Sequence, residues 1–122
     1  MRQGGSSPHV LVVHLDHFVR VRYRTLLEGA GCLVSTATDG GMAIDLLEHS
    51  ERTVGLILVN LSETLIRDSR FVERLSAHPQ WSAIPIVLMG AEPVPAPGNV
   101  AAVLTGDATD EVIVQTVLLL AR

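Results

Sequence analysis

The sequence contains no lysine, because all nine of its basic residues are arginine. This absence excludes phosphate binding through a Walker-type lysine and chemistry through a lysine Schiff base. The single cysteine, Cys32, excludes a disulfide framework and an internal CxxC zinc site. Aromatic residues make up only 3% of the chain, so a folded core must consist of aliphatic side chains.

The sequence also lacks the marks of nucleic-acid-binding, membrane and secreted proteins. Its formal net charge is −4, and no basic patch is dense enough to bind nucleic acid through counterion release. No apolar run reaches the roughly 18–20 residues that a membrane span requires. The first residues form no apolar segment of their own, which argues against a signal peptide. We therefore expect a cytoplasmic protein whose domain contacts neither membrane nor nucleic acid.

The apolar content is sufficient for one folded domain. The chain has 122 residues, of which 48% are hydrophobic, and a domain of this size buries about two-thirds of its unfolded surface. Residues 1–8 are rich in glycine, serine and other polar residues and predict a flexible tail. Residues 9–122 show no internal repeat and no linker, so they predict a single domain.

Short apolar runs predict β-strands that are covered on both faces. They contain β-branched residues and lack an alternation of apolar and polar positions, which is typical of strands in parallel sheets. The runs are residues 10–13, 32–34, 54–61, 84–89 and 100–104.

The segments between these runs have the period of amphipathic helices. We expect Asp39 and Asp107 to cap two of them at the amino-terminal end, and Gly29 and Gly31 to mark the end of the first. The predicted helices are residues 19–30, 41–50, 65–77 and 108–121.

The order of these elements predicts an α/β fold with a doubly wound, parallel sheet and helices on both of its faces. A fourth crossover helix would be expected between the last two strands. The segment at this point contains Pro93, Pro95 and Pro97, which forbid a regular helix because proline fixes φ and lacks an amide donor. We therefore expect an extended or irregular loop over residues 92–99 and a helix that is shortened or lost.

Several short motifs, taken in order and at their spacing, resemble the CheY-like receiver domains of response regulators. The matching segments are HVLVV at residues 9–13, then Arg20, LLEGAG at 26–31, ATDG at 37–40, LILVNL at 56–61 and IPIVLMGA at 84–91. The resemblance spans residues 9–122. It implies a flavodoxin-like fold with five parallel strands in the order 2-1-3-4-5, and a pocket at the carboxyl ends of strands 1 and 3.

The positions that carry the chemistry of that family are changed in this sequence. The two acidic residues that hold Mg²⁺ correspond to His14 and Leu15, and the phosphoacceptor aspartate corresponds to Asn60. Leucine offers Mg²⁺ no oxygen, and an amide is no useful nucleophile toward a phosphoryl donor. The hydroxyl residue after the fourth strand corresponds to Gly90, and the lysine after the fifth to Gly106. The resemblance thus implies a degenerate receiver, or pseudo-receiver, without catalytic residues, metal or cofactor.

Asp16 leaves one alternative open for this degenerate pocket. It lies one residue beyond the usual acidic pair and, with His14 and Asn60, could hold a cation weakly. His14 and His17 flank it, but they span a strand end and a loop, which favours a loop histidine and a helix-start residue over a metal site.

Three other features have simple structural interpretations. Arg20, Arg22 and Arg24 could meet an acidic partner, although a solvated helix face is the simpler explanation. Trp81 is expected to cover the edge of the core, and Cys32 to be a small core residue.

We expect a protein that is not an enzyme. The leading hypothesis is an atypical, phosphorylation-independent pseudo-receiver that acts as a protein–protein interaction module in two-component-like or phosphorelay signalling, with an unknown effector or a second copy as its partner. One alternative is a binder of a small ligand or metal in the vacated pocket of His14, Asp16, Asn60, Gly90 and Gly106. Another is the amino-terminal regulatory domain of a longer regulator whose effector domain is missing.

The last helix predicts a contact surface. Ile113, Val117 and Leu120 form the stripe that should pack on the sheet. A flank beside this stripe could cover sheet surface that a shortened helix leaves bare. Alternatively it stays exposed and forms a homodimer or binds an effector. The residues that extend the apolar surface along the two flanks are Val112, Val114, Leu118 and Leu119.

Overall fold

The computed structural model describes residues 7–50, 53–60, 70–90, 100–105 and 107–121. One sheet of five parallel strands has the order β2-β1-β3-β4-β5, which confirms the predicted fold class. The strands are β1 (His9–Val13), β2 (Leu33–Ala37), β3 (Leu56–Asn60), β4 (Ile86–Met89) and β5 (Val100–Leu104).

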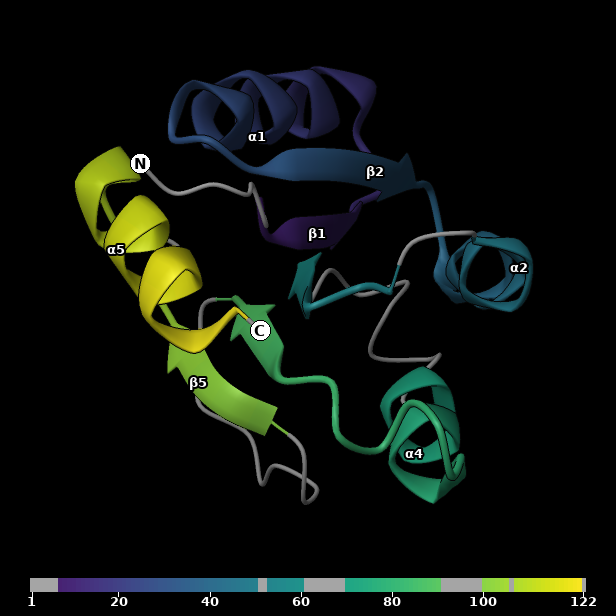
Figure 1. Ribbon diagram of the computed structural model, residues 1–122. Helices are drawn as coiled ribbons and strands as arrows, with labels where there is room; N and C mark the ends of the chain where they lie inside the picture. The colour runs from purple at the N-terminus through teal and green to yellow at the C-terminus, as the bar shows by residue number, and fades with distance from the viewer. Residues whose placement is uncertain (1–6, 51–52, 61–69, 91–99, 106, 122) are drawn as a thin grey trace.

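Helices cover both faces of the sheet, as the alternation of elements predicts. They are α1 (His17–Gly29), α2 (Gly40–His49), α4 (Arg70–Ala77) and α5 (Asp110–Leu120). Figure 1 shows α1 and α5 on one side of the sheet and α2 and α4 on the other. We call these the α1–α5 side and the α2–α4 side. The predicted loop at residues 92–99, and with it the helix expected to be shortened or lost, lies outside the described residues.

Each side of the sheet has its own aliphatic core, because alternate residues of a strand point to opposite faces. On β1, Val10 and Val12 belong to the core under α1 and α5, whereas Leu11 and Val13 belong to the core under α2 and α4. β1 and β3 lie between other strands, and their apolar side chains are fully buried. The apolar runs in the sequence lack alternation because both faces of these strands are covered.

Helix α1 is capped at both ends. Asp16 is its N-cap and accepts hydrogen bonds from the amides of Phe18 and Val19. At the other end Gly31, with φ +95°, turns the chain so that the Cys32 amide donates to the Leu27 carbonyl at 3.0 Å. Only a residue without a side chain adopts this backbone conformation readily, which explains Gly31.

The caps of the other helices confirm one prediction and correct another. Asp39 caps α2 as predicted, accepting from the amide of Met42 at 2.9 Å. Asp107 was expected to cap α5, but Thr109 does so instead, accepting from the amide of Val112 at 3.2 Å. The Asp107 carboxylate accepts a hydrogen bond from the hydroxyl of Thr105 and lies too early in the chain to reach the first turn of the helix.

Trp81 covers the edge of the core on the α2–α4 side, as predicted. It is half-buried, packs against that core and stacks on the ring of His78, with ring centroids 3.7 Å apart. Cys32 is buried, and this burial raises the pKa of its thiol, which suits a core residue better than a reactive one. No helix within the described ranges is long and apolar enough to cross a membrane.

Candidate functional site

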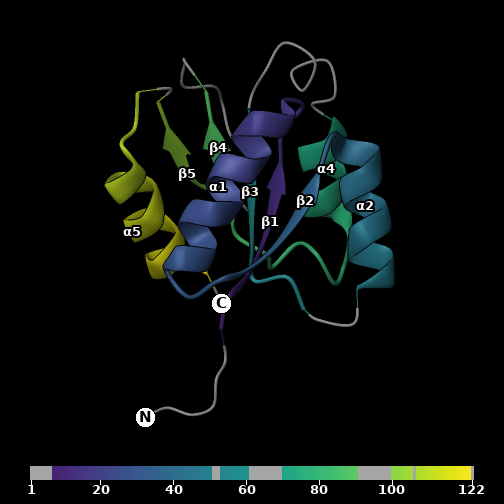
Figure 2. The same cartoon turned by 90° about the horizontal axis from the view of Figure 1, so that it is seen from above.

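The residues predicted to form the pocket lie at the carboxyl ends of the strands. Figure 2 shows the strands pointing toward the same end of the molecule. The register pairs Val13 of β1 with Val59 of β3, so the residues that follow, His14 and Asn60, lie side by side at this edge. In parallel α/β sheets such an edge is where ligands bind.

The remaining predicted pocket residues are only partly described. Gly90 follows β4 and is buried, and its amide donates to the carbonyl of Leu104 at 3.0 Å. It therefore belongs to the same edge as His14. Gly106 and the side chain of Asn60 lie outside the described residues, so their part in a pocket stays a prediction.

Asp16 is engaged as a helix cap. Its Oδ1 atom accepts from the amide of Phe18 at 2.8 Å and from that of Val19 at 3.3 Å. These amides belong to the first turn of α1 and have no partner within the helix. Turning the carboxylate toward Asn60 would leave both amides without this acceptor. The arrangement disfavours the alternative in which Asp16 holds a cation.

His14 is held in its neutral form by its surroundings. Its Nδ1 atom accepts a hydrogen bond from the amide of Asp16 at 2.9 Å, which requires a ring nitrogen without a proton. Burial lowers the pKa of His14; the charge of Asp16 opposes this shift, and the charge of Arg20 adds to it. A neutral ring at this position adds no charge to the edge of the sheet.

Arg20 donates hydrogen bonds to the loop between β1 and α1. Its Nη1 atom donates to the carbonyl of His14 at 2.8 Å and to that of Leu15 at 2.9 Å. The guanidinium thus replaces two hydrogen bonds that these carbonyls would otherwise make with water. The side chain of Leu15 extends outward and is 55% exposed.

The other two arginines of α1 also have partners within the molecule. Arg22 forms an ion pair with Asp110 of α5, and Arg24 pairs with Glu28 one turn further along α1, at 3.2 Å. The predicted alternative of an acidic partner for this cluster has no support in these contacts. A solvated helix face with local ion pairs accounts for them.

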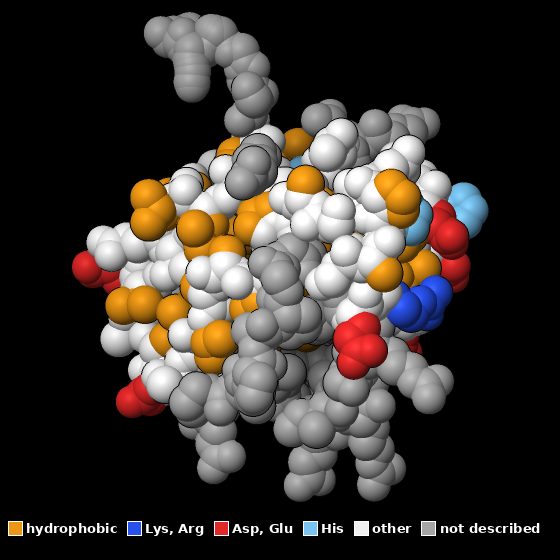
Figure 3. All heavy atoms as spheres, turned by 90° about the horizontal axis from the view of Figure 1, so that it is seen from below, with side chains coloured by type: hydrophobic (Ala, Val, Ile, Leu, Met, Phe, Trp, Pro, Cys, Tyr) orange, Lys and Arg blue, Asp and Glu red, His pale blue; other side chains and the backbone are white. Residues whose placement is uncertain are grey.

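The exposed surface of α5 corresponds only in part to the predicted one. Val112, Leu118 and Leu119 are 42%, 46% and 82% exposed. Val114 is partly buried instead and packs, like Leu120, against the core of the α1–α5 side. Figure 3 shows apolar side chains spread along the side of the molecule on which Figure 1 places α5 and β5.

A concave region away from the carboxyl edge was not predicted from the sequence. A groove of about 380 Å³ runs between α2 and the neighbouring strands β1 and β2. Its residues include the polar residues His9 and Ser35, each of which lies next to one of the apolar runs that predict strands. That polarity is the only signal in the sequence, because the groove depends on how α2 is placed over β2.

Neither a protein-family model nor a curated protein matches the sequence. Solved structures do resemble it. CheY4 of Vibrio cholerae, a chemotaxis response regulator, is 20% identical with a TM-score of 0.79, over 94% of this chain and 99% of that one. The receiver domain of a histidine kinase from Syntrophus aciditrophicus is 18% identical with a TM-score of 0.79, over 93% and 89%.

A third similar structure is a CheY-like receiver domain protein from Methanospirillum hungatei. It is 22% identical with a TM-score of 0.75, over 93% of this chain and 94% of that one. Identities of this size show a common fold and nothing more specific. Together with the strand order, they show that this chain has the fold of CheY-like response-regulator receiver domains.

Proposed function

We propose that this chain is a phosphorylation-independent receiver-like domain that acts as a non-enzymatic protein-interaction module in signal transduction. The observation that carries the proposal is the loop after β1. It presents a neutral His14, an outward-facing Leu15 and an Asp16 that caps α1. Magnesium-dependent phosphoryl transfer needs a pair of carboxylate ligands at this place, and the loop has one carboxylate, that of Asp16, whose Oδ1 atom accepts from two amides of α1.

The replacement of the phosphoacceptor supports the same proposal. Asn60 ends β3, where the resemblance implies an aspartate. A carboxamide cannot form an acyl phosphate by the route of the family, because its nitrogen and oxygen are poor nucleophiles toward phosphorus. A domain that keeps this fold without the reaction still has its surface for binding.

The exposed face of α5 is the surface that we propose for this binding. Leu118 and Leu119 are apolar and exposed on the two flanks of the helix, and the polar residues Glu111 and Gln115 lie between them. Exposed apolar side chains with polar residues beside them are typical of protein interfaces. A second copy of this chain is the partner we propose first, because a self-complementary patch closes in a twofold dimer.

The first test concerns the chemistry. The purified protein is incubated with acetyl phosphate and Mg²⁺ beside a receiver domain that has its acidic residues, and intact mass is measured. We expect a phosphoryl adduct on the control protein alone. The variant Asn60→Asp is also expected to stay unmodified, because Leu15 still offers no metal ligand. An adduct on the unaltered chain would contradict the proposal.

The second test concerns the surface. Multi-angle light scattering at micromolar concentration is expected to give the mass of a dimer, and Leu118→Glu or Leu119→Glu the mass of a monomer. Gln80→Glu is the matched control, since it adds the same charge to an exposed position beyond α4, away from α5, and should leave the dimer intact. A monomer that neither leucine variant changes would exclude α5 as a self-association surface.

A further inference from the structure

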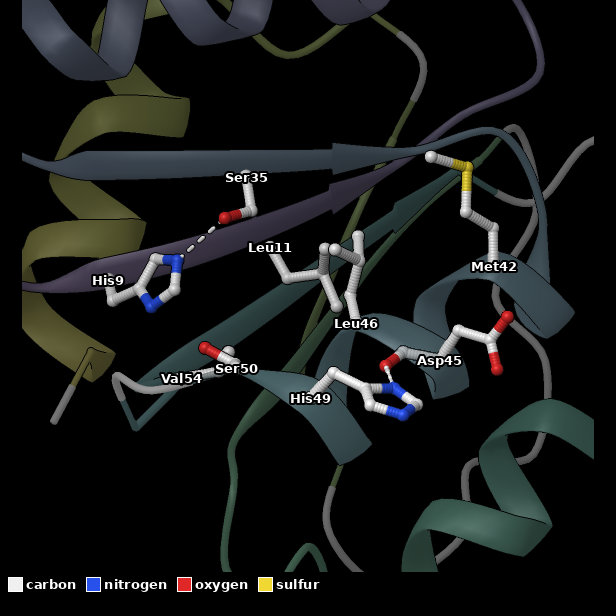
Figure 4. A pocket seen from close by; sticks show the side chains of 9 residues that line it. All are labelled: His9, Leu11, Ser35, Met42, Asp45, Leu46, His49, Ser50 and Val54. Atoms are coloured by element: carbon white, nitrogen blue, oxygen red, sulfur yellow. Dashed lines mark hydrogen bonds between the residues drawn. The ribbon is translucent and has the colours of Figure 1, made fainter.

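A groove lies between α2 and the strands β1 and β2, away from the carboxyl ends of the strands. Figure 4 shows His9 and Leu11 from β1 and Ser35 from β2 on one wall, with Leu46 and His49 from α2 opposite them. Its volume of about 380 Å³ falls within the range of small-ligand pockets. It lies on the α2–α4 side, so it is separate from the surface of α5.

The groove exists because a small polar residue occupies the edge strand. Ser35 pairs in register with Leu11, and its side chain faces α2. A larger side chain at this position would fill the space between β2 and α2. His9 leans toward the same serine, since its Nε2 atom lies 2.8 Å from the Ser35 hydroxyl. This hydrogen bond keeps the imidazole at one end of the groove and leaves the middle open.

The middle of the groove is apolar. Leu11 is fully buried beneath it, and Leu46 and Val54 complete this part of the wall. An aromatic ring or a branched aliphatic group would bury apolar surface here at about 25 cal/mol for each Å² removed from water. Two hydroxyl side chains, those of Ser35 and Ser50, also line the groove.

The outer rim carries negative charge, because the Asp45 carboxylate extends from α2 on the side away from His9 and Ser35 (Figure 4). Nine residues line the groove, and among them Asp45 is the acidic residue and none is an arginine. A ligand atom of Asp45, one of Glu48 and one of His49 all lie within 4.8 Å of one another. His49 Nδ1 lies 2.8 Å from the backbone carbonyl of Asp45, so this nitrogen donates and the other ring nitrogen is an acceptor in the neutral ring.

We propose that this groove binds a small organic amine. Its protonated amino group lies against the carboxylate of Asp45, and its apolar body lies against Leu11 and Leu46. Charge complementarity favours an amine over an acid, because the lining offers an anion no cation. The inference stands independently of the proposed function, since it uses neither α5 nor the loop after β1.

The experiment is a titration of the ¹⁵N-labelled protein with 2-phenylethylamine, followed through amide chemical shifts. We expect saturable shifts at Ser35, Leu46 and His49, with a Kd on the order of 1 mM for a ligand of this size. The parallel titration uses 3-phenylpropionate, which has a similar body and the opposite charge. Its affinity is expected to be at least about tenfold weaker.

Two variants separate the charge from the cavity. Asp45→Asn keeps the shape of an exposed side chain and is expected to weaken amine binding about threefold to tenfold. Glu73→Gln is the matched control, because it removes an exposed carboxylate from α4, which does not line the groove, and should leave the affinity unchanged. Ser35→Leu fills the groove and is expected to abolish binding, with its ¹⁵N spectrum serving as the check that the variant is folded.

Three results would overturn the proposal. One is equal binding of the amine and the acid, and another is unchanged amine affinity in Asp45→Asn. The third is a titration in which Zn²⁺ shifts the amides of Asp45 and His49 while the amine shifts nothing, which would assign the rim to a metal ion instead.

Discussion

The two sides of the sheet share the same five strands, but the helices cover these two sides to different degrees. On the α1–α5 side, α1 is capped at both ends, and the Arg22–Asp110 ion pair joins it to α5. Tyr23 and Leu27 of α1 are buried against the sheet. On the α2–α4 side, α2 buries Ala43 and Ile44 but leaves a groove over β2.

The difference arises from alternate residues of a single edge strand. Val34 of β2 faces the α1–α5 side and packs against its core, whereas Ser35, the next residue, faces the groove. Because one residue step moves a side chain to the other face, a single small residue is enough to open one side without changing the other. How completely a helix covers one face of the sheet therefore depends on single residues of the edge strand.

The comparison is tested most strongly by truncating one leucine on each side. Leu27 of α1 is fully buried, and Leu46 of α2 is only partly buried beside the groove. We expect Leu27→Ala to lower the free energy of unfolding by about 2–5 kcal/mol and Leu46→Ala by roughly 1 kcal/mol. Urea unfolding followed by circular dichroism measures both.

Phe18→Ala serves as the control for this pair, because Phe18 is 81% exposed. Its effect is expected to stay within about 0.5 kcal/mol. Equal losses for Leu27→Ala and Leu46→Ala would show that the two sides are equally closed.

The next prediction concerns the end of α1. Gly31 has φ +95°, whereas Gly29 lies in the helix, and an added Cβ atom would meet nothing within 4 Å at either position. Gly31→Ala is therefore expected to destabilise the fold by about 1–2 kcal/mol through backbone strain alone. Gly29→Ala is expected to stabilise it by up to about 1 kcal/mol, since alanine favours a helix.

Thermal unfolding of the two glycine variants measures this difference. The expectation is a lower Tm for one and a higher Tm for the other. A loss of similar size at both positions would mean that strain at Gly31 is not what ends the helix.

The start of α1 gives a smaller effect. Removing the cap with Asp16→Ala is expected to lower the free energy of unfolding by about 1 kcal/mol, because two amides lose their acceptor. Asp16→Asn should keep nearly all of the stability, since asparagine is an equally good cap. Denaturant unfolding of both variants decides whether Asp16 acts through hydrogen bonding; a loss in Asp16→Asn as large as that in Asp16→Ala would assign its effect to charge.

The smallest predicted effect depends on pH. Burial lowers the pKa of His14 from its ordinary value of 6.5, so the folded ring resists a proton that the unfolded chain accepts. Stability is therefore fully present above pH 6.5 and falls as the pH drops from 6.5 toward the lower folded value. His14→Asn is expected to flatten this part of the curve of unfolding free energy against pH. An unchanged curve in the variant would assign the dependence to other histidines.

The fold followed from the sequence because its signals are local and repeated. Apolar runs without alternation predicted strands covered on both faces, and each predicted run overlaps an observed strand. The cap of α5 was predicted at Asp107 and found at Thr109, because both residue types are good caps and only the backbone decides which one reaches the first turn.

The candidate site was less accessible to prediction from the sequence. The register brings His14 and Asn60 to one edge, as the resemblance implied. The hydrogen bonds that commit Asp16 and Arg20 to the loop depend on side-chain conformations that no residue pattern specifies. The groove depends on the spacing between α2 and β2, which is a tertiary property, and the polar residues His9 and Ser35 are its signal in the sequence.

Trp81 gives the α2–α4 side an optical reporter of its own. It is the single tryptophan of the chain, and it is half-buried against that core beside His78. Its fluorescence will follow loosening of that side, whereas far-ultraviolet circular dichroism follows helices on both sides. Coincident transitions of the two signals would indicate cooperative unfolding of the whole domain. A fluorescence change that precedes the loss of ellipticity would indicate that the grooved side opens first.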